Sequence, residues 1–304
     1  MGLRRLLLLC ALVAAAVLAP AAGASHRSLH GRIVFSLGRD DSNGTGAYRL
    51  LTVNPDGSGL KQLTSGRTSD VNPAWSPDGT TIAFGRGDSD SDVGDAIWTI
   101  GSDGRNAVDL TGGSHGDEPA WSPDGTTIVY VRYVHKLWQI WRMNADGSEQ
   151  RLLSTSPKST ADRRPWFSHD GKTILFVRQY QSKTRYRYAI WRMNADGTQP
   201  RRVTATSKAI VWTARPSPGG LKIAYATETL HVIGADGSGD FDTKVATREN
   251  PSLSWAPDGS VVACGCGSTG SLQILDPLKR KLTLLLRLPV KGLNSVEGLD
   301  WSSR

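Results

Sequence analysis

A carboxylate pair, Asp117–Glu118, and an arginine pair, Arg163–Arg164, each end three residues before an aromatic side chain. Guanidinium groups hold carboxylates or phosphates through two parallel hydrogen bonds, and carboxylates repel the same anions. Two such pairs set close together would grip a polar ligand or a peptide segment and fix its orientation. Whether the pairs meet depends on the elements that carry them.

A run of alternating aspartates, Asp88, Asp90 and Asp92, begins like a calcium-binding loop. An EF-hand loop needs a glycine at its sixth position and a glutamate at its twelfth. Here the glycine comes one place late, at Gly94, and Thr99 stands at the twelfth position. These departures exclude an EF-hand and leave a looser calcium site as an open alternative.

The sequence gives little support for a catalytic site. The string GGSHG at 112–116 matches G-x-S-x-G, but that nucleophile motif needs a strand-to-helix turn, and a strand is predicted after it. Only His115 and His135 fall in the variable loops described below, too few for a catalytic metal site. We therefore expect no cofactor and favour a protein that is not an enzyme, with a polysaccharide lyase or hydrolase as the alternative.

These residues lie within a repeat. The string PAWSPDGTTI occurs twice without change, at Pro73–Ile82 and Pro119–Ile128, and looser copies follow. Its aromatic residue defines what we call the repeat Trp position. This position recurs at intervals of 46, 46, 49, 39 and 46 residues, at Trp75, Trp121, Phe167, Pro216, Trp255 and Trp301. A second hairpin, such as IWRMNADG at 140–147 and 190–197, alternates with the first.

Each repeat predicts four antiparallel strands. Asp-Gly between alternating apolar runs signals a tight hairpin, because glycine accepts the positive φ that the turn demands. The second strand is apolar on both faces, as in Ile128–Val131, which is typical of a sheet packed between two others. Four strands repeating every 40 to 50 residues or so indicate the blade of a β-propeller.

The two ends of the chain indicate how many blades there are. Residues 32–64 supply strands two, three and four of a blade, and GLDW at 298–301 supplies a first strand. Together they complete one blade and leave no free edge. We therefore predict an all-β fold over residues 31–304: a six-bladed β-propeller of four-stranded blades, closed by pairing the C-terminal strand with the N-terminal blade.

The two hairpins, in this order and followed by a terminal Leu-Thr, resemble the TolB-type, WD40-like propeller repeat. The resemblance covers residues 31–304 and implies the propeller fold. It also implies a partner-docking role in the bacterial envelope. We expect the mature chain to enter its first blade directly, without the α/β domain that precedes the propeller in TolB.

Blade geometry defines two faces of the ring. The Asp-Gly turns lie on one, which we call the DG face. The connections from strand two to strand three and from blade to blade lie on the other, the variable face. Its loops are acidic in the first two blades, at 38–46 and 87–95, and basic and aromatic in the next two, at 132–136 and 178–188. Variable loops on a rigid scaffold commonly carry function, so we expect ligand binding here.

The blade-to-blade connections come closest to the central channel and carry the charged pairs. We predict a ligand-binding ring at this channel mouth, made of Asn72, Asp117, Glu118, Arg163, Arg164, Trp212 and Glu297. The arginines would recognise an anion, and Trp212 would supply stacking area. Pairing of these charges with each other is the alternative. Because loops lie outside the blade cores, we expect loss of both arginines to weaken binding without lowering the melting temperature.

Residues 1–24 predict export. A basic start, an apolar run at Leu6–Leu18 and an Ala-Gly-Ala pattern before Ser25 are typical of a cleaved secretory signal peptide. The apolar run is too short for a comfortable membrane span, and an uncleaved anchor is the alternative. Residues 25–30 would form a short linker, and no membrane span would remain after cleavage.

The charge of the chain bears on its partners. Its 36 Lys and Arg against 28 Asp and Glu give a formal net charge of +8. The excess is spread along the chain and forms no nucleic-acid-binding tract. We expect a secreted or periplasmic monomer that acts as a non-catalytic scaffold and binds a protein or an anionic envelope polymer, but no nucleic acid.

Overall fold

The computed structural model describes residues 29–39, 47–88, 96–154, 156–247, 251–260, 262–264, 271–276, 281–287 and 293–302. The predicted signal peptide at 1–24 lies outside the described residues, as do Asp90 and Asp92 of the calcium candidate. The described residues form strands and turns, and they contain no helix that could cross a lipid bilayer.

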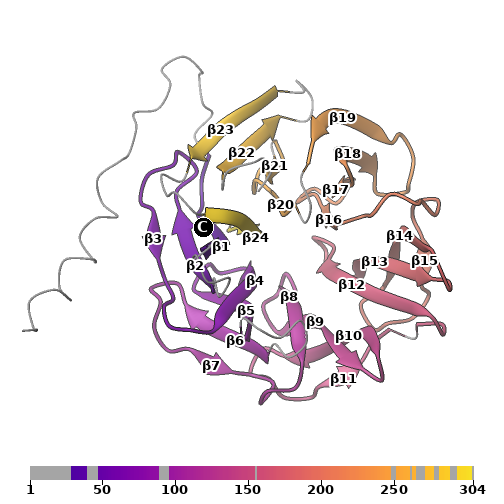
Figure 1. Ribbon diagram of the computed structural model, residues 1–304, viewed down its shortest axis with the longest axis horizontal. Coiled ribbons are helices and arrows are strands. Elements are labelled where there is room, and N and C mark those ends of the chain that lie inside the picture. The colour runs from indigo at the N-terminus through magenta and orange to yellow at the C-terminus, as the bar shows by residue number, and fades with distance from the viewer. Residues whose placement is uncertain are drawn as a thin grey trace, which may run out of the picture.

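Six four-stranded antiparallel sheets stand around a central axis, as Figure 1 shows. The first three blades contain β1 (Ile33–Arg39), β2 (Tyr48–Val53), β3 (Lys61–Gln62); β4 (Ser69–Trp75), β5 (Thr81–Gly87), β6 (Ala96–Gly101), β7 (Val108–Asp109); and β8 (Gly116–Trp121), β9 (Thr127–Val134), β10 (Leu137–Asn144), β11 (Arg151–Leu152). The last three contain β12 (Thr160–Phe167), β13 (Thr173–Gln181), β14 (Tyr186–Asn194), β15 (Arg201–Arg202); β16 (Thr213–Pro216), β17 (Lys222–Ala226), β18 (Thr229–Gly234), β19 (Phe241–Ala246); and β20 (Leu253–Trp255), β21 (Val262–Cys264), β22 (Ser271–Asp276), β23 (Lys281–Arg287). The predicted six-bladed propeller is confirmed.

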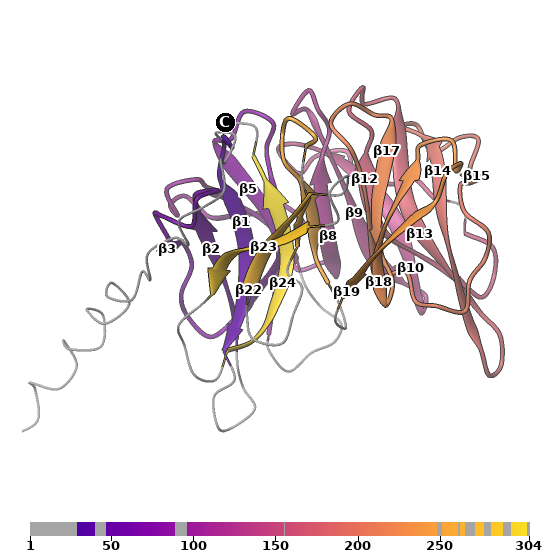
Figure 2. The ribbon, with the colours of Figure 1, turned by 90° about the horizontal axis from the view of Figure 1, so that it is seen from above.

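The last strand, β24 (Leu293–Trp301), closes the ring. It pairs antiparallel with β1, placing Ile33 opposite Trp301, and the two strands run side by side in Figure 2. In Figure 1, β24 is the innermost strand of blade one. The indole nitrogen of Trp301 donates to the His30 carbonyl at 2.8 Å, and the backbone nitrogen of Ser302 donates to the Arg32 carbonyl at 2.8 Å. The closure predicted from the chain ends is therefore confirmed.

Local hydrogen bonds explain why the repeated strings form these hairpins. In the Ser-Pro-Asp-Gly turn, the Ser76 hydroxyl donates to Asp78 Oδ1 at 2.5 Å, and Gly79 takes a φ of 70°. In the terminal Leu-Thr, the Thr111 hydroxyl oxygen accepts from the backbone nitrogen of Ile97 on the third strand at 2.9 Å. Both motifs thus satisfy polar groups where a strand ends.

The glycine of the second Asp-Gly turn also fits against the preceding blade. A Cβ added at Gly147 would lie 2.7 Å from the Leu110 carbonyl oxygen, and its φ is 86°. Between the blades lie apolar clusters such as the one that joins Leu50 of blade one to Trp75 and Phe84 of blade two. The hydrophobic cores therefore lie between the blades, and close packing in them fixes the position of each blade against its neighbours.

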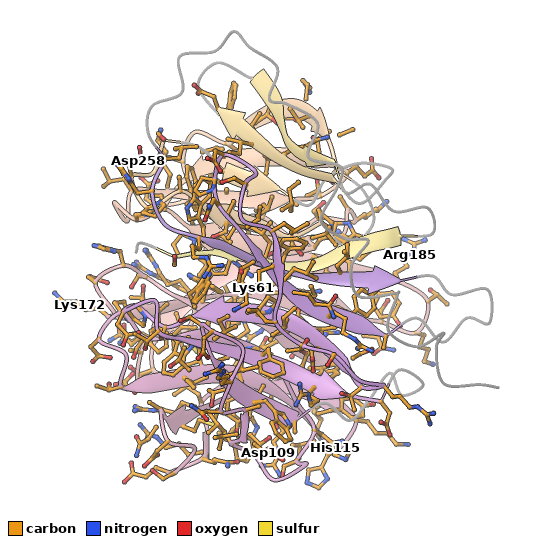
Figure 3. All side chains as sticks on the ribbon, turned by 90° about the vertical axis from the view of Figure 1, so that its left-hand side faces the viewer. Lys61, Asp109, His115, Lys172, Arg185 and Asp258 are labelled. Carbon is orange, nitrogen blue, oxygen red and sulfur yellow. The ribbon has the colours of Figure 1, made fainter. Side chains whose placement is uncertain are left out.

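Figure 3 shows the two faces of the ring edge-on. Lys172 and Asp258, from turns between first and second strands, project on one side, while Arg185, from the turn between β13 and β14, projects on the other. His115, in a blade-to-blade connection, also lies on the side of Arg185. The DG face and the variable face are therefore opposite ends of one channel.

Candidate functional site

A backbone bulge in the first strand turns the predicted ring residues toward the axis. The pairing of β4, β8 and β12 with their neighbours is interrupted by register shifts. Inside these shifts Asn72, Glu118 and Arg164 have φ values of 51°, 54° and 56°. A proline follows each of the three, which suits a bulge because proline donates no ladder hydrogen bond.

Glu118 binds both arginines of the predicted pair. Its Oε1 accepts from Arg163 Nη2 at 2.8 Å and lies 3.1 Å from Arg164 Nε, and its Oε2 accepts from the Arg164 backbone nitrogen at 2.6 Å. Only 5% of the Glu118 surface is exposed. The carboxylate from blade three and the arginines from blade four are therefore partners of each other.

Asn72 and Asp117 extend this network. Asn72 Nδ2 donates to Asp117 Oδ1 at 2.9 Å, and Asn72 Oδ1 accepts from Arg164 Nη1 at 3.2 Å. The space left around Asn72, Glu118 and Arg164 is a cavity of about 10 Å³. Such a volume lies at the lower limit for one water molecule, so the space among these residues leaves no room for a larger ligand.

Burial and charge divide the two carboxyl groups. Burial and the neighbouring Glu118 raise the pKa of Asp117 above its ordinary value. Burial also acts to raise the pKa of Glu118, but Arg163 and Arg164 outweigh it, and the net direction is downward. Glu118 is thus the ionised partner of the arginines, whereas Asp117 is the carboxyl group that is more easily protonated.

The structure brings together five of the seven residues predicted for the ring: Asn72, Asp117, Glu118, Arg163 and Arg164. Trp212 lines neither described cavity; it is half-buried, and its backbone nitrogen donates to the Ala226 carbonyl at 2.9 Å. Glu297 lies in β24 opposite Ser36, and its side chain is outside the described part of the chain. That the ring binds a ligand remains a prediction.

The premise of one expectation about the arginines is wrong. The melting temperature is expected to be unaffected by their loss because loops lie outside the cores. Arg163 and Arg164 instead lie in the middle of β12, at its bulge, and bind the buried Glu118 carboxylate. Removing both would leave that charge buried without a partner, which strongly destabilises a fold.

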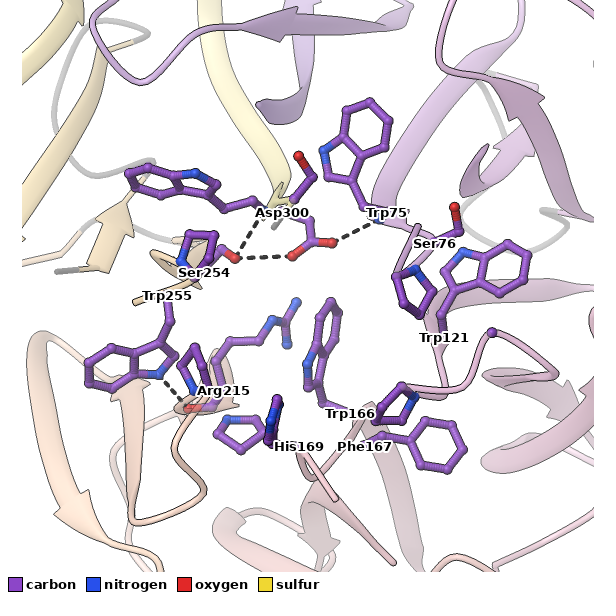
Figure 4. A pocket seen from close by; sticks show the side chains of 18 of the residues that line it. Trp75, Ser76, Trp121, Trp166, Phe167, His169, Arg215, Ser254, Trp255 and Asp300 are labelled. Carbon is purple, nitrogen blue, oxygen red and sulfur yellow. Dashed lines mark hydrogen bonds between the residues drawn. The ribbon is translucent and has the colours of Figure 1, made fainter. Parts of the chain in front are cut away.

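The larger hollow lies at the opposite end of the channel. A cavity of about 810 Å³ opens among the Ser-Pro-Asp-Gly turns of the DG face, as Figure 4 shows. All six residues of the repeat Trp position line it, namely Trp75, Trp121, Phe167, Pro216, Trp255 and Trp301. It is therefore walled by rings from every blade.

Four further lining residues come from the position just before the repeat Trp: Trp166, Arg215, Ser254 and Asp300. The sequence prediction did not include them. These positions adjoin the repeat Trp on the first strand, which is the innermost strand of each blade, so they lie beside the channel. Counting back one residue from the repeat Trp is the signal that could have identified them. In the two remaining blades the position holds alanine, at Ala74 and Ala120.

Arg215 and Asp300 give this cavity its charge. Arg215 Cζ lies 4.1 Å from the centroid of the Trp166 ring, and burial lowers the pKa of Arg215 to about 10. Asp300 accepts from the Trp75 backbone nitrogen at 2.8 Å and from the Ser254 hydroxyl at 3.0 Å, and burial raises its pKa. Arg215 is therefore still a cation near neutral pH.

The metal and enzyme candidates can be placed as well. Asp88 is exposed at the end of β5, and His115 and His135 are exposed in loops. Within the described ranges, no three His, Cys, Asp or Glu side chains gather closely enough to hold a metal ion.

Comparison with known proteins identifies the repeat. The family model described as the TolB beta propeller domain matches residues 30–186. No curated protein sequence matches the chain. Among solved structures, TolB from Acinetobacter baumannii is similar with 21% identity and a TM-score of 0.69 over 90% of this chain, which spans 66% of the TolB length.

Two further structures share the fold at lower identity. One, titled as a nidogen/laminin complex, has 11% identity and a TM-score of 0.71 and covers 90% of this chain and 98% of its own. The other, an oligogalacturonate lyase in complex with manganese, has 16% identity and a TM-score of 0.54 over 86% of this chain and 75% of its own. These likenesses establish architecture alone. Together with the family match over residues 30–186, they lead to one conclusion: this chain belongs to the TolB β-propeller family.

Proposed function

We propose that the chain is a non-catalytic binding scaffold, exported to the periplasm or the cell surface, that recognises a protein or an anionic envelope polymer. The TolB-like propeller fold supports a binding scaffold. Export is supported by the signal-peptide pattern at 1–24. The polysaccharide lyase or hydrolase alternative has the support of a shared fold only.

The observation that carries the proposal is the cavity of about 810 Å³ on the DG face. A concave site with aromatic walls and convergent polar groups, here including Arg215, Ser254 and Asp300, is the usual form of a binding site. The variable end of the channel is closed by its own ion pairs around Glu118. We therefore favour the DG face over the variable face as the working surface.

A blocking variant tests which face works. His169 is exposed at the cavity rim, at the turn position where other blades carry proline. His169→Trp would narrow the mouth without disturbing a core. Lys183→Trp, on the exposed β13–β14 turn of the variable face, is the matched control.

Both variants and the wild type would be immobilised and exposed to the envelope fraction of the source organism. We expect one partner to be retained by the wild type and by Lys183→Trp, and to bind His169→Trp at least about tenfold more weakly. Loss with Lys183→Trp alone would return the working surface to the variable face. Export has a separate test: N-terminal sequencing of the mature protein should begin at Ser25.

A further inference from the structure

Arg215 differs from Arg86 of β5 and Arg178 of β13, and unlike Arg192, whose buried Nε also has no partner among the described residues, it lines the DG-face cavity. Arg86 and Arg178 each hold a carboxylate oxygen at 2.6 Å, from Asp70 and Asp162. Within the part of the chain that the structure describes, no carboxylate lies within 4.0 Å of the Arg215 guanidinium, and its buried Nε has no hydrogen-bond partner. A buried cation without a counter-ion is costly and calls for a reason.

The guanidinium of Arg215 is held in position and aimed at the cavity. One face stacks on the Trp166 ring at 4.1 Å, and Nη1 donates to the Ala214 carbonyl at 3.3 Å. Figure 4 shows its terminal nitrogens pointing into the open centre. A guanidinium group fixed in this way can donate two parallel hydrogen bonds, as a fork, to a planar anion, because its side chain loses little further rotamer entropy on binding.

Asp300 attracts Arg215 electrostatically but makes no ion pair with it within 4.0 Å. Its two oxygens accept from the Trp75 backbone nitrogen and the Ser254 hydroxyl. Burial raises the pKa of Asp300, so its negative charge is itself disfavoured. Arg215 therefore remains a cation on the inner wall of the cavity with no carboxylate in contact among the described residues.

The other charged groups of the wall disfavour an anion with more than one negative charge. Asp78 and Asp124 also line the cavity, and hydrogen bonds from Ser76 and Ser122 hold their pKa values below the ordinary range. With Asp300, the cavity thus has three carboxyl groups and one guanidinium in its lining. This charge balance favours a carboxylate monoanion over a phosphate dianion.

Flat rings alternate with small polar side chains on the rest of the wall. Trp121 and Trp166 lie around the opening in Figure 4, and Pro123 and Ser217 also line the cavity. Among the described residues, the indole nitrogens of Trp75 and Trp121 have no hydrogen-bond partner. Flat aromatic walls favour a planar ligand body that stacks.

We propose that the DG-face cavity binds a small organic acid, with one carboxylate on the Arg215 fork and a flat apolar body against the Trp166 side of the cavity. This rests on the proposed function of the cavity as the binding site and adds the chemistry of its ligand.

Three probes separate the parts of this proposal. Indole-3-acetate carries both features, indole-3-acetamide lacks the charge, and acetate lacks the flat body. By isothermal titration calorimetry on the mature chain, we expect indole-3-acetate to bind at least about tenfold more tightly than either of the others. Arg215→Met should abolish the preference of the acid over the amide, and Arg215→Lys should reduce it. Arg202→Met, an exposed arginine on β15, is the matched control and should behave as wild type.

Each outcome has a distinct meaning. Equal binding of acid and amide, unchanged in Arg215→Met, would overturn the carboxylate site and leave the cavity as a partner site. If none of the three probes binds, the proposal is also overturned, provided that equal melting temperatures of the wild type and Arg202→Met show both proteins to be folded. If His169→Trp in addition leaves partner capture intact, the DG-face cavity is not the binding site of the scaffold either. Thermal unfolding of each arginine variant guards against a folding defect.

Discussion

Two levels of one channel hold their charges in opposite ways. At the variable end, Glu118 is bound by Arg163 and Arg164 and almost no space remains. At the DG end, Arg215 has no carboxylate in contact among the described residues, and a large cavity lies before it. Both levels are built from the first strands of the blades, a few residues apart.

The difference shows that charge in a sequence does not by itself mark a binding surface. A pair of opposite charges on neighbouring blades neutralises itself, and its function is then to hold the blades together. A single charge without such a neighbour is left for an external partner. Burial strengthens both effects, because electrostatic interactions are stronger where water is excluded.

Deleting residues 299–304 should have the largest effect, because it removes the framework shared by both levels. Trp301 would leave the closing inter-blade core, and Ile33–Phe35 of β1 would lose their strand partners. Losing one large buried aromatic residue costs about 3–5 kcal/mol, a large part of the total stability of a typical domain. Differential scanning calorimetry should show a melting temperature lower by about 6–20 °C. An unchanged melting temperature would contradict the ring closure.

Glu118→Ala should be the next most damaging change. It leaves Arg163 and Arg164 without their carboxylate, and breaking a buried pair costs about 3–5 kcal/mol. Urea unfolding monitored by tryptophan fluorescence gives the free energy of unfolding. Glu228→Ala, an exposed glutamate, is the control and should change it by less than about 0.5 kcal/mol. If the two variants were equally stable, the network would contribute nothing.

Asp300→Asn should show a smaller effect that depends on pH. The pKa of Asp300 is raised above its ordinary value of 3.8 in the folded protein, so the fold prefers its protonated form. Its ionisation therefore costs stability as the pH rises through the raised pKa, a cost that asparagine does not have. The melting temperature of the variant minus that of the wild type should become more positive between about pH 4 and pH 8. A difference that becomes more negative would mean that Asp300 is stabilised as an ion.

Arg215→Met should change stability least. The burial cost that lowers the pKa of Arg215 to about 10 disappears with the charge, while the contact with Trp166 is kept in part by the methionine side chain. We expect the free energy of unfolding to stay within about 1 kcal/mol of wild type, or to rise. If Arg215→Met lowered the free energy of unfolding as much as Glu118→Ala, Arg215 would be part of a stabilising contact, and the two levels of the channel would not differ.

The fold was predictable because its signals are local and periodic. Each Asp-Gly turn and each Leu-Thr needs only its own hairpin, and the interval between Trp75 and Trp121 repeats. The site was harder, since Glu118 and Arg163 are 45 residues apart and their pairing depends on how adjacent blades rotate. Arg215 was missed for another reason. It stands before Pro216, where the aromatic marker of the repeat is lost, so its axis-facing position has to be counted from the neighbouring blades.

The pairing of β24 with β1 also makes the cavity a late product of folding. The hydrogen bond from the Arg32 backbone nitrogen to the Ser302 hydroxyl joins residues 270 positions apart in the chain. Contacts of such long range form slowly, because the entropy of a very large loop must be lost before the contact is gained. Asp300 and Trp301, which line the cavity, arrive only with that contact. A nascent or partly folded chain therefore lacks the complete cavity. Binding of a ligand in this cavity would be a measure of the fraction of chains whose ring has closed.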